Sequence, residues 1–126
     1  MTRIRIITAL LLLGLAAVGG CSAPDARIDG LLGLDEKDRS AIQIATSRQL
    51  QLGYQISSVA SKDDALDFCH EMCSRSVESC NLSEDLCAYS RAYPEVASLI
   101  GRCRVSRERC RDHRRRLPRQ CVCSGD

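Results

Sequence analysis

Eight of the nine cysteines in this chain of 126 residues lie in residues 69–123, which read CHEMCSRSVESCNLSEDLCAYSRAYPEVASLIGRCRVSRERCRDHRRRLPRQCVC. Cys73, Cys80 and Cys87 follow one another at intervals of seven residues, as do Cys103 and Cys110. Because seven residues make nearly two turns of an α-helix, each set lies along one side of its helix. The stretch therefore predicts two helices, each with a line of cysteines.

These cysteines are symmetric about Glu95, beside the turn signal Tyr93-Pro94. In an antiparallel helical hairpin, residues equidistant from the turn face each other. The spacing therefore predicts the disulfides Cys87–Cys103 and Cys80–Cys110. Cys73 would face position 117, where Leu117-Pro118 ends the helix, so the chain tail can bring Cys121 and Cys123 within reach. We predict Cys73–Cys121 and Cys69–Cys123 for the outer bridges, and the exchanged pairing stays open.

Such bridges matter because the core is poor in large side chains, with 3% aromatic residues and no tryptophan. A disulfide that closes a long loop stabilises a domain by about 2–4 kcal/mol. An even number of cysteines in an exported chain is typical of a disulfide framework. We expect the disulfides, more than the core, to decide whether this domain folds.

The residues before the cysteines predict one further helix, which begins near Asp35 as its cap. Its inward side is marked by a 3-4-3-4-3 spacing through Ile42, Ala45, Gln49, Leu52, Ile56 and Val59. The next helix is expected over about 62–92, after a capping box at Ser61 and Asp64, and the last from Pro94 to about 116. No alternating strand pattern is present. The predicted fold is all-α: a disulfide-stapled antiparallel helical hairpin with one preceding amphipathic helix.

The N-terminus has the form of a secretory signal peptide, with Arg3 and Arg5 before an apolar run over residues 6–18. The following Val18-Gly19-Gly20-Cys21 resembles the lipobox of bacterial lipoproteins. That resemblance implies cleavage before Cys21 and its modification with a diacylglycerol and often a further acyl chain (such as palmitate), which together hold a protein stably on a membrane. Ser22 after the cysteine resembles outer-membrane sorting. The alternatives are an ordinary cleaved signal peptide and an uncleaved anchor.

We accordingly divide the chain into a lipoprotein signal peptide (1–20), a tether (21–34) and a Cys-rich helical domain (35–126). The pattern C-x₃-C-x₆-C-x₆-C-x₁₅-C-x₆-C-x₁₀-C-x-C in residues 69–123 is similar to that of uncharacterised Cys-rich helical lipoproteins of Gram-negative bacteria. The resemblance implies a shared stapled fold and a location in the cell envelope. It implies no activity.

Charge is distributed unevenly: residues 21–95 hold seven basic and thirteen acidic residues, and residues 96–126 hold nine and three. We expect acidic residues of the middle helix to pair with arginines of the last helix, namely Asp67, Glu71, Glu78, Glu84 and Asp85. The alternative is a basic strip that contacts the phosphates of an anionic glycolipid. Its candidate residues are Arg107, Arg111, Arg114, Arg115 and Arg116. Aromatic residues that would stack on nucleic acid are not interleaved with these arginines, so no nucleic-acid partner is expected.

Candidates for chemistry are few. A redox or metal site is conceivable from a cluster of cysteines and one histidine, namely Cys69, His70, Cys73, Cys121 and Cys123. The spacing lacks the C-x₂-C pair of zinc sites, and thiolates in an oxidising compartment form disulfides first. His70 and His113 are expected on the surface. We therefore expect no enzyme and no cofactor, but a lipid-anchored structural or interaction module whose partner is an envelope protein or an anionic glycolipid.

Overall fold

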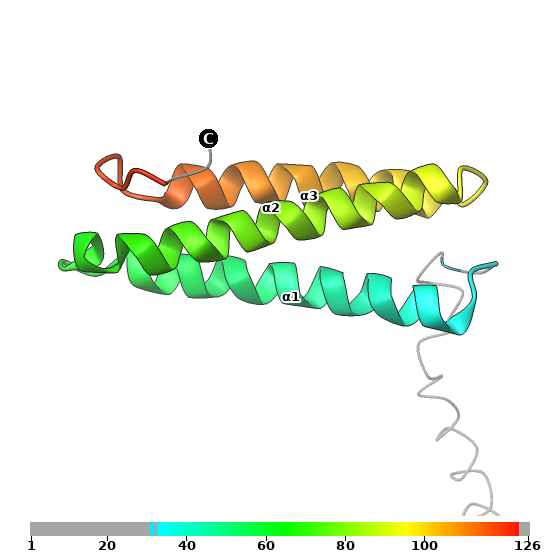
Figure 1. Cartoon of the computed structure of the whole chain (residues 1–126), viewed down its shortest axis with the longest axis horizontal. Helices are drawn as coiled ribbons and strands as arrows, with labels where there is room; N and C mark the ends of the chain where they lie inside the picture. Colours follow the sequence, from blue (N-terminus) through cyan, green and yellow to red (C-terminus); the bar gives the residue numbers. More distant parts are fainter. Residues whose placement is uncertain (1–30, 32, 124–126) are drawn as a thin grey trace, which may run out of the picture.

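The computed structural model describes residue 31 and residues 33–123, and the predicted signal peptide, Cys21 and most of the predicted tether lie outside this range. The elongated bundle consists of three helices, α1 (Glu36–Ala60), α2 (Cys69–Ala92) and α3 (Ala97–Arg116). Each helix runs antiparallel to the one before it (Figure 1). A short 3₁₀ helix (Ala65–Phe68) leads into α2. The described residues contain no strand, so the all-α fold class is confirmed. None of the described helices is long and apolar enough to cross a membrane.

Helix α1 begins and packs as its sequence predicts. The Asp35 carboxylate accepts a hydrogen bond from the backbone N–H of Asp38 at 2.8 Å, which caps the helix. Every residue of the predicted inward side is buried, and Gly53 joins them. The 3-4 periodicity therefore marked the buried side of α1 correctly.

The other two helices begin later than predicted. Ser61 makes no capping box, because it ends α1: its backbone N–H bonds to the carbonyl of Ser57. The buried Ala65 then sits in the 3₁₀ turn, and α2 begins only at Cys69. Pro94 lies in the α2–α3 turn, and α3 begins at Ala97 because the residue before it has a non-helical backbone and a buried side chain.

Apolar side chains form two separate clusters. The cluster at the α2–α3 turn contains Leu31, Leu34, Ile42, Ala45, Leu86, Val96 and Leu99. The cluster at the opposite end is smaller and consists of Val59, Ala65 and Met72, with Phe68 and Leu117 packed against it. Leu31 and Leu34 fall in the predicted tether yet are 1% and 4% exposed, because they close the turn-end cluster. The folded body therefore starts before residue 35, which corrects the predicted boundary.

Four disulfides join α2 to α3 and to the chain tail. Cys87–Cys103 and Cys80–Cys110 form as the symmetry about Glu95 predicts, with Cα atoms 4.6 and 4.8 Å apart. The outer pairs are Cys69–Cys121 and Cys73–Cys123, with Cα atoms 5.2 and 5.4 Å apart. The predicted Cys73–Cys121 and Cys69–Cys123 pairing was therefore wrong, and the open exchange is the one observed.

A turn after α3 explains the outer pairing. Cys69 and Cys121 both lie twenty-six residues from Glu95, so they obey the same symmetry as the inner pairs. The backbone N–H of Cys121 then bonds to the carbonyl of Pro118 at 2.9 Å, which turns the tail back toward the bundle. Cys123 consequently reaches Cys73, one helical turn further along α2.

Candidate functional site

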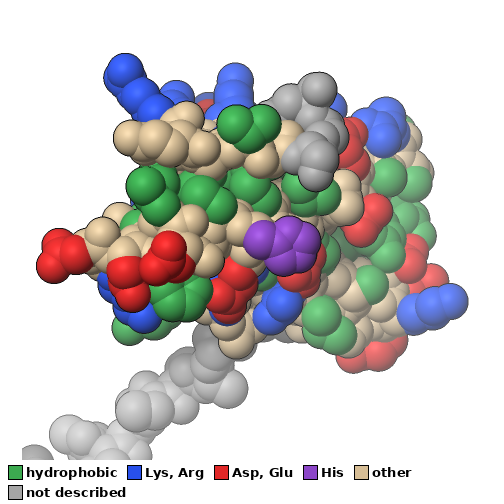
Figure 2. Space-filling view, turned by 60° about the vertical axis from the view of Figure 1, so that its left-hand side comes forward, with side chains coloured by type: hydrophobic (Ala, Val, Ile, Leu, Met, Phe, Trp, Pro, Cys, Tyr) green, Lys and Arg blue, Asp and Glu red, His purple; other side chains and the backbone are tan. Residues whose placement is uncertain are grey.

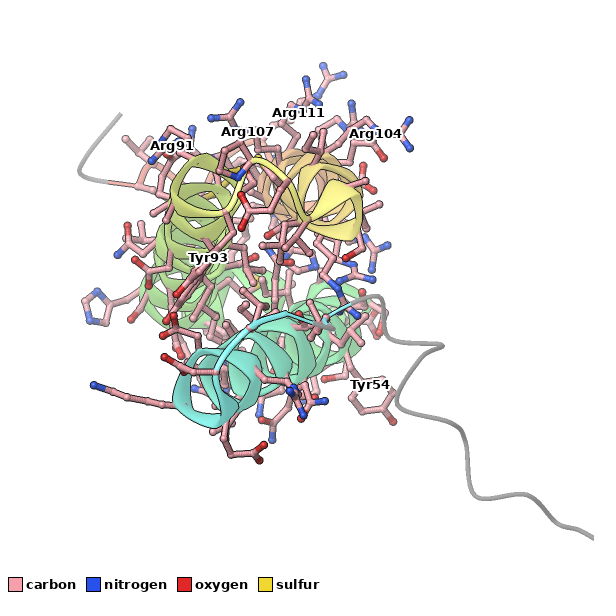
Figure 3. The ribbon with its side chains drawn as sticks, turned by 90° about the vertical axis from the view of Figure 1, so that its right-hand side faces the viewer. Tyr54, Arg91, Tyr93, Arg104, Arg107 and Arg111 are labelled. Carbon is pink, nitrogen blue, oxygen red and sulfur yellow. A yellow bond between two sulfur atoms is a disulfide. The ribbon has the colours of Figure 1, made fainter. Side chains whose placement is uncertain are left out.

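A row of arginines on α3 lies beside a shallow groove between α2 and α3. The groove has a volume of about 790 Å³ and is lined by Arg104, Arg107, Arg111 and Arg114. Intervals of three and four residues place these four side chains on one side of α3. In the end-on view, Arg104, Arg107 and Arg111 point away from α1, and Arg91 of α2 extends from the same side of the bundle (Figure 3). In the space-filling view, basic side chains line the upper edge of the molecule (Figure 2).

Three of the four arginines in this groove, Arg104, Arg107 and Arg111, carry charge without an ion-pair partner among the described residues. Glu84 is the acidic residue among those that line it. Within residues 31 and 33–123, no salt bridge of Arg104, Arg107 or Arg111 is found. The groove therefore presents a concentrated positive charge to the solvent.

The expected pairing of α2 acids with α3 arginines is wrong for two residues. Both carboxylate oxygens of Glu78 accept hydrogen bonds from Arg48 of α1, at 2.6 and 3.0 Å. That guanidinium lowers the pKa of Glu78. Glu71 pairs with Arg75, one turn along its own helix. Neither acid lines the groove of the arginine row, which the linear sequence does not reveal.

The five arginines predicted for an anionic contact are divided by the structure. Arg107, Arg111 and Arg114 share the groove, which Arg104 joins although the prediction omitted it. Arg115 instead pairs with Asp112 and holds the pKa of that carboxyl below its usual value. Arg116 donates to the hydroxyl of Ser57 on α1. The signal that separates these groups is the spacing 104-107-111-114, which continues one side of the helix.

The predicted redox or metal cluster is held in disulfides. Cys69, Cys73, Cys121 and Cys123 form the two outer bridges, and His70 is exposed beside them. In the part of the chain that the structure describes, no group of three or more His, Cys, Asp or Glu side chains is placed to hold a metal ion. Thiolate chemistry at this end requires that at least one of these bridges first be reduced.

His113 is buried, with 5% of its surface exposed, which corrects its predicted surface position. Its Nδ1 lies 2.7 Å from the hydroxyl of Ser79. The imidazole packs against Gly53 of α1, where a Cβ atom would lie 3.0 Å from Cε1 and closer still to Nε2. Burial lowers the pKa of His113, and Arg116 lowers it further. Gly53 in the inward side of α1 was the one sequence signal of this close approach.

A buried hydrogen-bond network continues from His113 and joins all three helices. The amide nitrogen of Gln49 donates to the carbonyls of Ser79 and Ser106, each at 3.0 Å. The hydroxyl of Ser106 donates to the amide oxygen of Gln49 at 3.0 Å. Because Ser79 is fully buried, its contact with His113 is out of a substrate's reach, and the network serves to hold α1 in register on the hairpin.

A second polar contact closes the turn end of the bundle. The Tyr93 hydroxyl donates to the Asp38 carboxylate, which connects the α2–α3 turn to the first turn of α1. The hydrogen bond to Asp38 raises the pKa of Tyr93 to about 12, and burial and the negative charge of that carboxylate act in the same direction. Figure 3 shows Tyr93 on the α2 side of the bundle and Tyr54 on the outer side of α1. Tyr54 is 78% exposed, on a side of α1 where the exposed residues 40, 43, 44, 47, 50, 51, 54 and 58 are all uncharged.

Comparison of the chain with models of known protein families, with curated proteins and with solved structures finds no match. The function must therefore be argued from the described residues themselves.

Proposed function

We propose that this protein is a lipid-anchored, non-enzymatic interaction module of the cell envelope. The observation that carries the proposal is the set of four disulfides, which use all eight cysteines of residues 69–123. Such a framework persists in oxidising compartments outside the cytosol. The apolar N-terminal run and the lipobox resemblance at Cys21 agree with export and anchoring, with the outer membrane as the expected destination.

Two features of the folded body support a role in display and binding. The two outer bridges secure the chain tail, and the two inner ones hold α2 against α3, so the exposed side of α3 keeps one shape. A rigid surface loses little conformational entropy when it binds, which favours recognition. Among the described residues, the buried imidazole–hydroxyl pair of His113 and Ser79 serves packing between helices.

A redox or metal-handling function is the second candidate, and it rests on the proximity of four cysteine sulfurs at the tail. Both bridges must open before all four sulfurs can bind a metal, whereas a bridge that exchanges electrons alternates between the disulfide and two thiols. Cys121 and Cys123 are partly exposed, so a reductant can reach the tail more easily than the buried Cys87. This candidate therefore predicts free thiols in the native protein.

The test is an intact-mass measurement on protein taken from membranes, with thiol alkylation before and after reduction. We expect no alkylation of the native protein, eight alkylated cysteines after reduction and a mass that shows acyl chains on Cys21. Two or more thiols that react natively would favour the redox or metal candidate.

A variant at the anchor completes the test. Cys21→Ser should leave the membrane fraction or accumulate with its signal peptide, whereas the neighbouring control Ser22→Thr should fractionate as the wild type does. Equal membrane fractionation of Cys21→Ser and wild type, with no acyl mass on either, would overturn the anchoring part of the proposal.

A further inference from the structure

We propose that the groove between α2 and α3 binds the phosphate groups of an anionic glycolipid at a membrane surface, a proposal that rests on the envelope location proposed above. The first support is the geometry of the arginine row. From Arg104 to Arg114 the helix rises about 15 Å at 1.5 Å per residue, so the row can contact more than one phosphate. Each guanidinium presents parallel N–H groups that match two oxygens of a phosphate.

The second support is that the arginine side chains are available to a ligand and their backbone is held in place. Among the described residues Arg104, Arg107 and Arg111 have no acidic partner, so no internal salt bridge must break before they bind. Cys80–Cys110 and Cys103 line the same groove, and these disulfides hold the backbone beneath the arginines in place. The cost of ordering the site is therefore small.

The third support is a buried hydroxyl at the floor of the groove. Ser83 lines the groove and is 2% exposed, and its Oγ finds no hydrogen-bond partner within the described part of the chain. A buried hydroxyl without a partner is unfavourable by about 1–3 kcal/mol, and native proteins usually satisfy such groups. A phosphate oxygen that reaches Ser83 in the groove would accept this hydrogen bond.

Two observations favour a lipid over a soluble polyanion. Ile100, which is 59% exposed, lines the groove next to the arginines and offers an apolar contact beside the charged one. None of the described residues that line the groove is aromatic, so it lacks the stacking platform of single-strand nucleic-acid sites. A bare phosphate or a nucleic acid would leave Ile100 without a role, whereas a glycolipid supplies both phosphate and an apolar region.

The length of the chain before α1 permits this contact. Leu31 lies ten positions after Cys21, and an extended chain spans about 3.3–3.6 Å per residue, which gives a reach of about 35 Å. A bundle anchored at Cys21 can therefore lay its arginine row on the membrane that holds the anchor. In that orientation the uncharged outer side of α1 faces away from the membrane.

The experiment measures flotation of the mature chain, residues 21–126, with Cys21→Ser so that acyl chains contribute nothing. Vesicles are made of phosphatidylcholine alone or mixed with lipid A, a diphosphorylated glycolipid. We expect binding only to the mixed vesicles, with affinity that falls steeply as salt is raised. Because the anchor is absent, failure here is distinct from failure of the anchoring proposal, which the intact mass decides.

The decisive variant combines Arg104→Gln, Arg107→Gln and Arg111→Gln. Since each basic residue near an anionic surface contributes about fivefold, the variant should bind on the order of a hundredfold more weakly. The control Lys37→Gln, Arg39→Gln, Lys62→Gln removes the same charge elsewhere and should bind nearly as the parent does. An equal loss of vesicle binding in both variants would show that the net charge of the protein alone attracts it to the membrane, and it would overturn the proposed site.

Two further measurements identify the ligand. Ser83→Ala removes the buried hydroxyl without a change of charge and should weaken vesicle binding several-fold while the protein unfolds at the same or a higher denaturant concentration. Unchanged binding would overturn the role of Ser83.

Inorganic phosphate, a short single-stranded DNA and soluble lipid A are then compared as competitors for the vesicles. If phosphate or the DNA displaces the protein at concentrations as low as soluble lipid A does, the proposal of a glycolipid ligand is wrong.

Discussion

Helices α3 and α1 both pack on α2, but they are held there in different ways. Two disulfides join α2 directly to α3, and small buried residues such as Ser79 and Ser106 allow the helices to approach closely. Helix α1 contains no cysteine, and it is held by its apolar side and by the network around Gln49. The chain thus uses covalent bridges in one interface and burial with hydrogen bonds in the other.

This difference indicates which helix can move relative to the rest of the molecule. The α2–α3 hairpin with its arginine groove cannot separate without reduction, whereas α1 can loosen reversibly because noncovalent contacts alone retain it. In the middle of that attachment, between the two apolar clusters, Gly53 of α1 and His113 of α3 are in close contact. Substitutions in the two interfaces should therefore behave differently.

The largest effect is expected from the covalent interface. The double variant Cys80→Ala, Cys110→Ala opens a bridge between residues thirty apart and should lower the free energy of unfolding by about 2–4 kcal/mol. Urea unfolding followed by circular dichroism measures the loss. Ser74→Ala, an exposed substitution on the same helix, is the control and should change the midpoint little. A double variant as stable as the control would show that the Cys80–Cys110 bridge adds no stability to the α2–α3 interface.

A smaller effect is expected at the close contact of α1. Alanine normally favours a helix over glycine, but a Cβ at position 53 would push into the His113 ring, so Gly53→Ala should destabilise the protein by about 1–3 kcal/mol. Gly101→Ala in α3 is the matched control, because its Cβ would meet nothing within 4 Å, and it should be neutral or stabilising. The double variant Gly53→Ala, His113→Ala should recover part of the loss. Equal effects at both glycines would rule out the contact.

The smallest effect is a dependence on pH. The pKa of buried His113 lies below its unfolded value of 6.5, so the folded state binds fewer protons than the unfolded chain in mild acid. Stability is therefore complete above about pH 6.5 and declines as the pH falls through that value toward the lower folded pKa. Arg116 and Arg109 reinforce the shift and Asp112 opposes it. Each unit of pKa depression corresponds to about 1.4 kcal/mol at full protonation.

Chemical unfolding between pH 7.5 and 5 measures this decline, and His113→Gln serves as the control because its amide does not titrate. The slope of stability against pH should be steeper for the wild type than for the variant in this window. Parallel curves of stability against pH would show that His113 has the same pKa in the folded and unfolded chains. That result would contradict its burial against α1.

Much of the fold follows from local patterns. The inward side of α1 and the two inner disulfides were predictable, because helical periodicity and distance from a turn are properties of the chain alone. The symmetry about Glu95 also contained the Cys69–Cys121 bridge. This bridge was not predicted because the sequence indicates that the helix ends at Leu117 but does not determine the direction of the chain after that residue.

The turn after Pro118, the burial of His113 and the composition of the arginine groove were settled in three dimensions. The turn exists because Cys121 bonds back to Pro118, and it brings Cys123 to Cys73. His113 is buried because a residue sixty positions earlier, Gly53, leaves room for its ring. Periodicity assigns residues to the sides of a helix, but only the packing of distant helices shows which polar side is enclosed and which meets the solvent.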